Sequence, residues 1–164
     1  MCLYVKDYNP KVAKKDIVCY KLLRENIEYP SETKRYYTPF QDLKIILGQE
    51  VKAKGGLQKG TRKIFEWSSN REYRKLIYSG VIHTFKTFKD VEDFMLKFAS
   101  QYDAKNAVVV RCVIPKGTEY YEGIFESTGL KSYASKKLIY GGRILKRYYD
   151  LKENKRWYKY LFNL

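Results

Sequence analysis

A nearly continuous run of β-branched residues, AVVVRCVI at Ala107–Ile114, constrains the fold of this chain more than any other segment. Its valines and its isoleucine favour extended backbone, and their continuity leaves almost no polar face for water. A strand of this kind is typical of the middle of a sheet that is covered on both faces. We therefore expect Ala107–Ile114 to be a central, buried strand.

Segment 88–102 predicts one of the covering layers. Its apolar side chains recur at the spacing of a single helical face, at Val91, Phe94, Met95, Phe98 and Tyr102. Thr87 and Asp90 have the T-x-x-D form of a capping box, which favours a helix start at this point. The pattern predicts a helix packed on a sheet.

Short strands are predicted around this helix at 16–23, 43–47, 80–85, 118–125 and 136–140. We expect 118–125 to turn back at Pro115–Gly117 and pair with 107–114. The glycine- and lysine-rich segment Lys52–Lys63 is expected to be a surface loop, and Gly141-Gly142 is expected to end the last of these strands.

These elements predict the α+β class, with one domain over 1–164 and a mostly antiparallel or mixed sheet. A basic, aromatic C-terminal element at 143–164 is either a second helix, which we favour, or a final strand.

No apolar run approaches the roughly 18 residues of a membrane-spanning helix, and the N-terminal segment lacks the apolar stretch of a signal peptide. Cys2, Cys19 and Cys112 are odd in number and widely spaced, which favours neither a disulfide framework nor a zinc site. Cys19 and Cys112 lie in apolar runs and are expected to be small buried hydrophobes. We expect a cytoplasmic protein with no membrane span, metal or cofactor.

Charge is the strongest compositional signal, because 33 basic minus 18 acidic residues gives a net charge of +15. Residues 51–89 hold 10 basic and 2 acidic residues, as do residues 131–164, so each block carries +8. Residues 90–130 hold 4 basic and 7 acidic residues, a net of −3. Two basic blocks therefore flank an acidic one, and such a field attracts polyanions such as nucleic acid or an acidic protein.

Cations of the two basic blocks are the predicted binding residues. In the first block they are Lys52, Lys54, Lys59, Arg62 and Lys63. In the C-terminal element they are Arg143, Lys146, Arg147, Lys152, Lys155, Arg156 and Lys159, together with the aromatic Trp157. Cations that neutralise phosphates beside flat rings that stack on bases suit single-stranded nucleic acid. The same mixture also suits an acidic protein groove, or an amphipathic element that packs its aromatic residues inward.

Catalytic patterns are sparse. The sequence has no phosphate-binding loop, dinucleotide fingerprint or nucleophile elbow. His83 is the single histidine, so a histidine-dependent mechanism would have to use it, with Cys112 or Tyr121 as a partner. We therefore favour a non-enzymatic basic binding protein and expect His83→Ala to leave its function intact. The alternative is an enzyme on a nucleotide-binding scaffold centred on His83.

Several segments occur in a suggestive order: MCLYVKD, DIVCYKLL, YYTPF, GVIHTFKTFKDVEDF, VVVRCVIPKGTEYYEG and YASKKLIY. Together they resemble a family of short proteins of gut bacteria and their phages for which no activity is established. The resemblance spans most of residues 1–140 and implies a phage or mobile-element origin, with a host defence system as one conceivable target.

A second likeness involves IPKGT followed by a strand ending in LI. This arrangement is similar to the half of ADP-ribosyltransferases that holds their late catalytic glutamate. Here the corresponding positions are Ser135, Lys136 and Lys137. The resemblance therefore implies a related scaffold that lacks the residue which orients the nicotinamide ribose.

Overall fold

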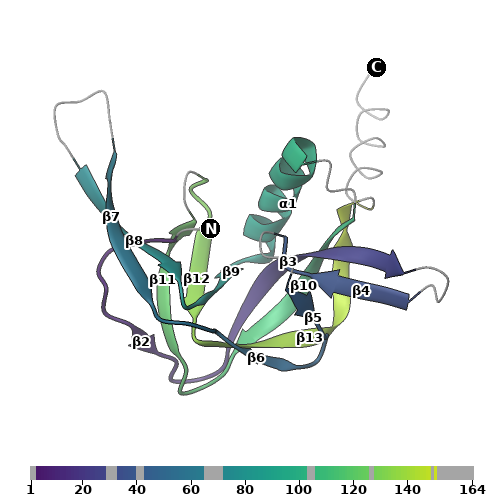
Figure 1. Ribbon diagram of the computed structural model, residues 1–164, viewed down its shortest axis with the longest axis horizontal. Coiled ribbons are helices and arrows are strands. Elements are labelled where there is room, and N and C mark those ends of the chain that lie inside the picture. Colours follow the sequence, from purple (N-terminus) through teal and green to yellow (C-terminus); the bar gives the residue numbers. More distant parts are fainter. Residues whose placement is uncertain are drawn as a thin grey trace.

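A computed structural model describes residues 3–28, 33–39, 43–64, 72–102, 106–125, 128–148 and 150 of the chain. Within these ranges the chain forms thirteen strands and one helix (Figure 1). The predicted α+β class is wrong, because the fold is mostly antiparallel β-sheet with a single helix of minor extent. The sequence pattern underestimated the sheet because several polar segments that resemble loops are strands held by backbone hydrogen bonds.

The strands are numbered in chain order. They are β1 (Leu3–Val5), β2 (Lys11–Val12), β3 (Ile17–Glu28), β4 (Thr33–Tyr37), β5 (Lys44–Ile45), β6 (Glu50–Lys52), β7 (Gln58–Ile64), β8 (Glu72–Ser79), β9 (Ile82–Phe85), β10 (Ala107–Ile114), β11 (Glu119–Phe125), β12 (Lys131–Ser135) and β13 (Lys137–Arg147). The helix α1 (Phe88–Tyr102) lies between β9 and β10 in the chain.

All the strands belong to one sheet, whose main path runs β6-β13-β10-β3-β9-β12-β11-β1-β8-β7. The long strand β3 pairs with β10 along one edge. Along its other edge it meets β9 only at Tyr20↔Phe85, and β4 takes over from Arg24 onward. The sheet is therefore divided beside β3 into two parts that diverge.

The sheet curls strongly, because its two end strands are close in the chain. β6 and β7 lie at opposite ends of the path, yet only residues 53–57 connect them. Six Cα–Cα steps reach at most about 20 Å, far less than the width of a flat sheet of ten strands. The connection also packs against the β8–β9 turn, since a Cβ atom on Gly80 would lie 2.4 Å from the Gly56 carbonyl oxygen. Gly80 also has a φ of +73°. This position therefore needs both a left-handed backbone conformation and the absence of a side chain, and glycine provides both.

The core lies on both sides of β10. Val108, Val110 and other alternate residues of β10 pack with β3 and β13 on one face. Ala107 and Val109 pack on the other face against Val91 and other residues of α1. The predicted central position of this strand is confirmed, but its burial on both faces is complete only over Ala107–Val110, because Arg111 is exposed and Val113 is half-buried. The predicted burial of Cys19 and Cys112 is confirmed, and these free thiols face each other across β3 and β10.

The helix begins and ends at the predicted residues. The Asp90 N–H donates to the Thr87 hydroxyl at 3.1 Å, which confirms the predicted N-terminal cap. Val91, Phe94 and Met95 are buried, whereas the side chains of Phe98 and Tyr102 lie outside the described part of the structure. No helix in the described ranges is long and apolar enough to cross a membrane.

Three local predictions are wrong. Strand β11 does not pair with β10, because the Ala13 N–H donates to the Thr118 carbonyl at 3.0 Å and the chain is drawn toward β2. Segment Lys52–Lys63 is not a loop throughout, since it includes the end of β6 and most of β7. Strand β13 does not stop at the glycine pair but passes through it in an irregular stretch.

The glycine pair is the reason that β13 can continue. A Cβ atom on Gly141 would lie 2.5 Å from the Arg111 carbonyl oxygen of β10, so any other residue would push the strands apart. The preference for a C-terminal helix from residue 143 is also wrong for Arg143–Arg147, because these residues belong to β13. Residues 151–164 lie outside the described part.

Phe94 tests the role of α1. Its ring lies 4.9 Å from that of Phe85 and 5.1 Å from that of Phe125, between centroids. We expect Phe94→Ala to lower the free energy of unfolding by about 3–5 kcal/mol, because it removes apolar contacts and leaves a cavity. Urea unfolding followed by circular dichroism measures this loss. Lys89→Ala on the exposed side of α1 is the control, and equal stabilities of the two variants would contradict this packing.

Candidate functional site

Pairing between β6 and β13 brings the two basic blocks of the sequence together. Lys52, from the first block, lies directly opposite Lys137, from the second. Both side chains are exposed. Like charges at directly opposed positions of an antiparallel pair destabilise it. This placement therefore carries an electrostatic penalty in the free protein.

The same face of the sheet continues across β10 and β3. Because side chains alternate between faces, the registers place Val113 and Arg111 of β10 and Ile139 of β13 on the side that carries Lys137. Val18 of β3 completes the set. We call this surface the basic sheet face; it consists of Lys52, Arg111, Lys137, Val18, Val113 and Ile139.

The cations of the basic sheet face form no ion pair with a described carboxylate. Among the residues that the structure describes, no carboxylate lies within 4.0 Å of the charged groups of Lys52, Arg111 or Lys137. Glu50 is the acidic residue nearest in register, since it lies opposite Ile139 on this face. Its single charge offsets part of the three positive charges, so the face remains positive.

The apolar members of this face are open to solvent. Val18 is 37% exposed, and Val113 and Ile139 are half-buried. None of the three belongs to a core cluster formed by the described residues. The face ends where α1 covers the sheet, and there the Tyr20 ring meets the edge of Phe88 at 5.6 Å between centroids.

Further lysines border this face at the rim formed by the start of β3 and the end of β10. Lys14 and Lys15 precede β3, and Lys116 lies in the turn after β10; all three are exposed. Asp16 joins the two segments, because its Oδ1 accepts from the Lys116 N–H at 2.8 Å. The rim therefore adds positive charge beside the row that contains Lys137.

Other predicted binding residues of the first block are dispersed. Lys54 is exposed in the connection between β6 and β7. Lys59 lies on β7, where its Nζ donates to the Tyr8 carbonyl at 3.4 Å. Arg62 is exposed on the same strand, and Lys63 also lies there, but its side chain is outside the described part. Lys52 is thus the member of this block that the fold brings to the basic sheet face.

The predicted residues of the C-terminal element separate likewise. Arg143 is exposed in the irregular stretch of β13, and Lys146 is half-buried opposite Val109, beside α1. Arg147 points to the opposite face, where its guanidinium lies 3.3 Å from Glu25, and this ion pair lowers the pKa of Glu25 against the effect of its partial burial. Lys152, Lys155, Arg156, Trp157 and Lys159 lie outside the described residues, so their contribution stays a prediction.

Of the six residues of the basic sheet face, only Lys52 was among the predicted binding residues, and two of its three cations were missed. Arg111 lies in the net acidic block, and Lys137 was considered only as part of a strand and of the transferase-like segment. A signal existed for Arg111, because a single arginine inside the apolar run 107–114 marks the point where one face of the strand opens to solvent. No local signal places Lys137 opposite Lys52.

The ring nitrogens of His83 and the side chain of Tyr121 are buried rather than presented to a substrate, although His83 as a whole is half-buried. Both ring nitrogens of His83 are buried, and burial together with the nearby charge of Lys21 lowers its pKa to about 3. Tyr121 is 4% exposed, and burial raises its pKa. The ring of His83 is therefore neutral and poorly basic at neutral pH, which favours a structural role for it.

Lys21 is a buried cation near this histidine. It is 7% exposed, and its Nζ donates to the His83 carbonyl at 2.6 Å. Among the described residues no carboxylate lies within 4.0 Å of it, and burial lowers its pKa to about 8. Its hydrogen bond bridges the gap where β3 and β9 diverge, so we assign Lys21 to the architecture of the sheet.

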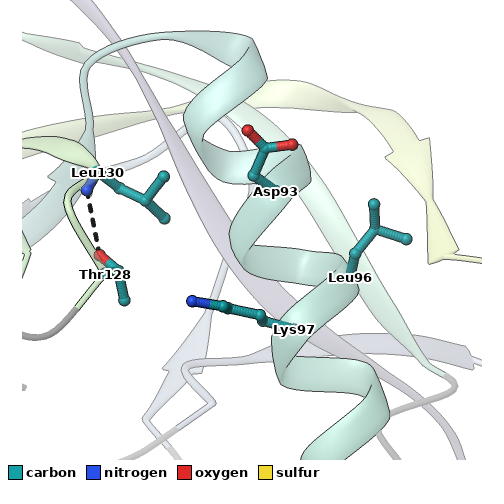
Figure 2. A pocket seen from close by; sticks show the side chains of 5 residues that line it. All are labelled: Asp93, Leu96, Lys97, Thr128 and Leu130. Carbon is teal, nitrogen blue, oxygen red and sulfur yellow. Dashed lines mark hydrogen bonds between the residues drawn. The ribbon is translucent and has the colours of Figure 1, made fainter.

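A shallow hollow of about 450 Å³ lies between α1 and the segment after β11 (Figure 2). Asp93, Leu96 and Lys97 of α1 line it together with Thr128 and Leu130, and the Lys97 side chain extends toward Thr128. Asp93 already pairs with Lys89, and the Thr128 hydroxyl accepts from the Leu130 N–H at 3.2 Å. Because these polar groups are engaged locally, the hollow is a weaker candidate site than the basic sheet face.

Comparisons with family models, curated proteins and solved structures found no match. The two resemblances noted in the sequence therefore stay predictions.

The Lys52–Lys137 pair makes a prediction about stability. We expect Lys52→Glu or Lys137→Glu alone to raise the free energy of unfolding by about 0.2–1 kcal/mol, because each replaces a repulsion with an attraction. The double variant should lose this gain. Urea unfolding of the parent, both single variants and the double variant gives the coupling energy. A coupling of zero would mean that the two side chains do not interact.

Lys21 makes a prediction about pH. Its pKa of about 8 lies below the ordinary 10.5, so its protonated form destabilises the fold at low pH, and this effect is relieved as pH rises from 8 to 10.5. We expect the parent to gain about 3 kcal/mol over that range relative to Lys21→Met. Urea unfolding at pH 7 and pH 10.5 measures the change. Lys89→Met is the exposed control, and parallel pH profiles for the parent and Lys21→Met would contradict the burial of a charge.

Proposed function

We propose that this protein is a non-enzymatic nucleic-acid-binding protein that uses the basic sheet face. The observation that carries the proposal is the direct opposition of Lys52 and Lys137, with Arg111 nearby and no carboxylate partner for any of them among the described residues. A phosphate group bound between the two lysines would convert their repulsion into two attractions. Binding would thereby remove a penalty that the free fold carries.

The type of cation supports phosphate as the ligand group. Arginine binds phosphate oxygens through two parallel hydrogen bonds, and lysine acts as a compact point charge. Arg111 and Lys137 lie on the adjacent strands β10 and β13, on either side of the Val113↔Ile139 pair. The net charge of +15 adds long-range attraction that speeds encounter with a polyanion.

The surroundings of the other candidate residues support binding rather than catalysis. The ring nitrogens of His83 and the side chain of Tyr121 are buried, and the basic sheet face presents no histidine, cysteine or paired carboxylates. Those are the groups that most often serve as general bases or nucleophiles.

An acidic protein is the competing partner, and salt dependence separates it from nucleic acid. Binding of a labelled oligonucleotide is measured by fluorescence anisotropy at several salt concentrations, with polyglutamate as a competitor. We expect Lys52→Gln/Arg111→Gln/Lys137→Gln to reduce the log–log salt slope by about 2, because each lost phosphate contact removes about 0.7–0.9.

The matched control removes the same charge from other exposed positions, with Lys6→Gln/Lys44→Gln/Lys131→Gln. This variant should keep most of the slope. Equal losses in both triple variants would mean that net charge alone drives binding. Polyglutamate that competes as well as an oligonucleotide of equal charge would support an acidic protein partner instead.

A further inference from the structure

We infer that the basic sheet face binds single-stranded nucleic acid, with unpaired bases packed on its apolar row and phosphates on the cations at either side. This inference rests on the proposed function and narrows its ligand. It derives from the order of the side chains on the face, which the pairing registers define.

The apolar residues form one row across three strands. Val18 lies opposite Val113, and Val113 lies opposite Ile139. Neighbouring strands are about 4.8 Å apart, so the row is roughly 10 Å long. That length matches the long dimension of a purine ring system, or of two adjacent pyrimidines, lying flat on the sheet.

The cations occupy rows on either side of this apolar row. Arg111 lies two residues from Val113 in one direction along the strands, and Lys137 lies two residues from Ile139 in the other. Each step of two residues is about 6.7 Å, so the cation rows are about 13 Å apart. A flexible single strand that crosses the face can therefore place phosphates about two nucleotides apart on the two rows while the bases between them cover the valines and the isoleucine.

The exposure of the apolar row favours single strands over duplex. In a duplex the base faces are stacked on one another, so only phosphates and groove edges would meet a flat sheet, and the apolar row would gain nothing. Unpaired bases have free faces that pack on protein side chains.

Tyr20 extends the row of Arg111. The two residues lie opposite each other on β3 and β10, and the Tyr20 ring is half-buried against Phe88. A ring held in this way loses little conformational freedom on binding. It therefore offers a partly exposed aromatic surface next to the arginine that would hold a phosphate.

The test compares three ligands with the same number of phosphates per strand: a twelve-residue deoxythymidine oligomer, the same oligomer without bases, and a twelve-base-pair duplex. Fluorescence anisotropy at fixed salt gives the three dissociation constants for the full chain. We expect the thymidine oligomer to bind at least tenfold more tightly than the abasic oligomer and more tightly than the duplex. The bases supply the difference between the thymidine and abasic oligomers, because these two ligands carry the same phosphates.

Paired variants locate the contact. Val113→Thr/Ile139→Thr keeps β-branched shapes but makes the row polar, and should weaken binding of the thymidine oligomer about tenfold while changing abasic binding less than twofold. Val12→Thr/Ile124→Thr is the matched control, because Val12 and Ile124 are exposed strand residues away from this face. Circular dichroism verifies that both variants are folded.

Each outcome separates this inference from the proposed function. Equal affinity for the thymidine and abasic oligomers, with loss of both in the Lys52→Gln/Arg111→Gln/Lys137→Gln variant, would overturn the inference but retain nucleic-acid binding. Tighter binding of the duplex than of the thymidine oligomer would also overturn the inference and retain nucleic-acid binding. Failure to bind any of the three ligands would overturn the proposed function itself.

Discussion

The ladder that holds β10 between β3 and β13 is the constraint on which the rest of the structure depends. Eight successive residues of β10 pair with β3, and β13 follows the other edge. One face of this ladder is buried in the core, and the opposite face is divided between α1 and solvent. Because β6 adds to the outer edge of β13, this ladder determines where the basic sheet face lies and which cations it contains.

The fold distributes its positive charges among three environments. Lys21 is inside the core, where desolvation lowers its pKa. Other cations are neutralised in ion pairs, because Glu25 pairs with Lys34 and Arg147, and Glu122 pairs with Lys11 and Lys86. Two carboxylates thus serve four cations, and none of this neutralisation reaches the basic sheet face. The face stays positive because these carboxylates lie in other parts of the sheet.

The exposed apolar row gives this positive surface a second property. A surface that served only to keep the protein in solution would carry charge without an apolar centre, whereas Val18, Val113 and Ile139 are arranged in register between rows of cations. Each member alone is an ordinary exposed or half-buried residue. Their alignment on one face, uncovered by α1, distinguishes this region from the scattered charges of β7 and supports a ligand with both phosphates and flat apolar groups.

Local pattern was sufficient to predict helix 88–102 with its Thr87 cap and the buried strand 107–114, because backbone hydrogen bonding and burial at these positions follow from nearby residues. The net charge and its division into blocks were also readable from composition. The neighbouring strand with which each strand pairs could not be predicted in this way. Whether 118–125 pairs with β10 or with β12, for example, is decided by contacts remote in sequence. The opposition of Lys52 and Lys137 arises from strand pairing across 85 positions (137 − 52). Only the tertiary structure could bring these two charges together, because backbone hydrogen bonds between strands carry no signature in the side chains that they align.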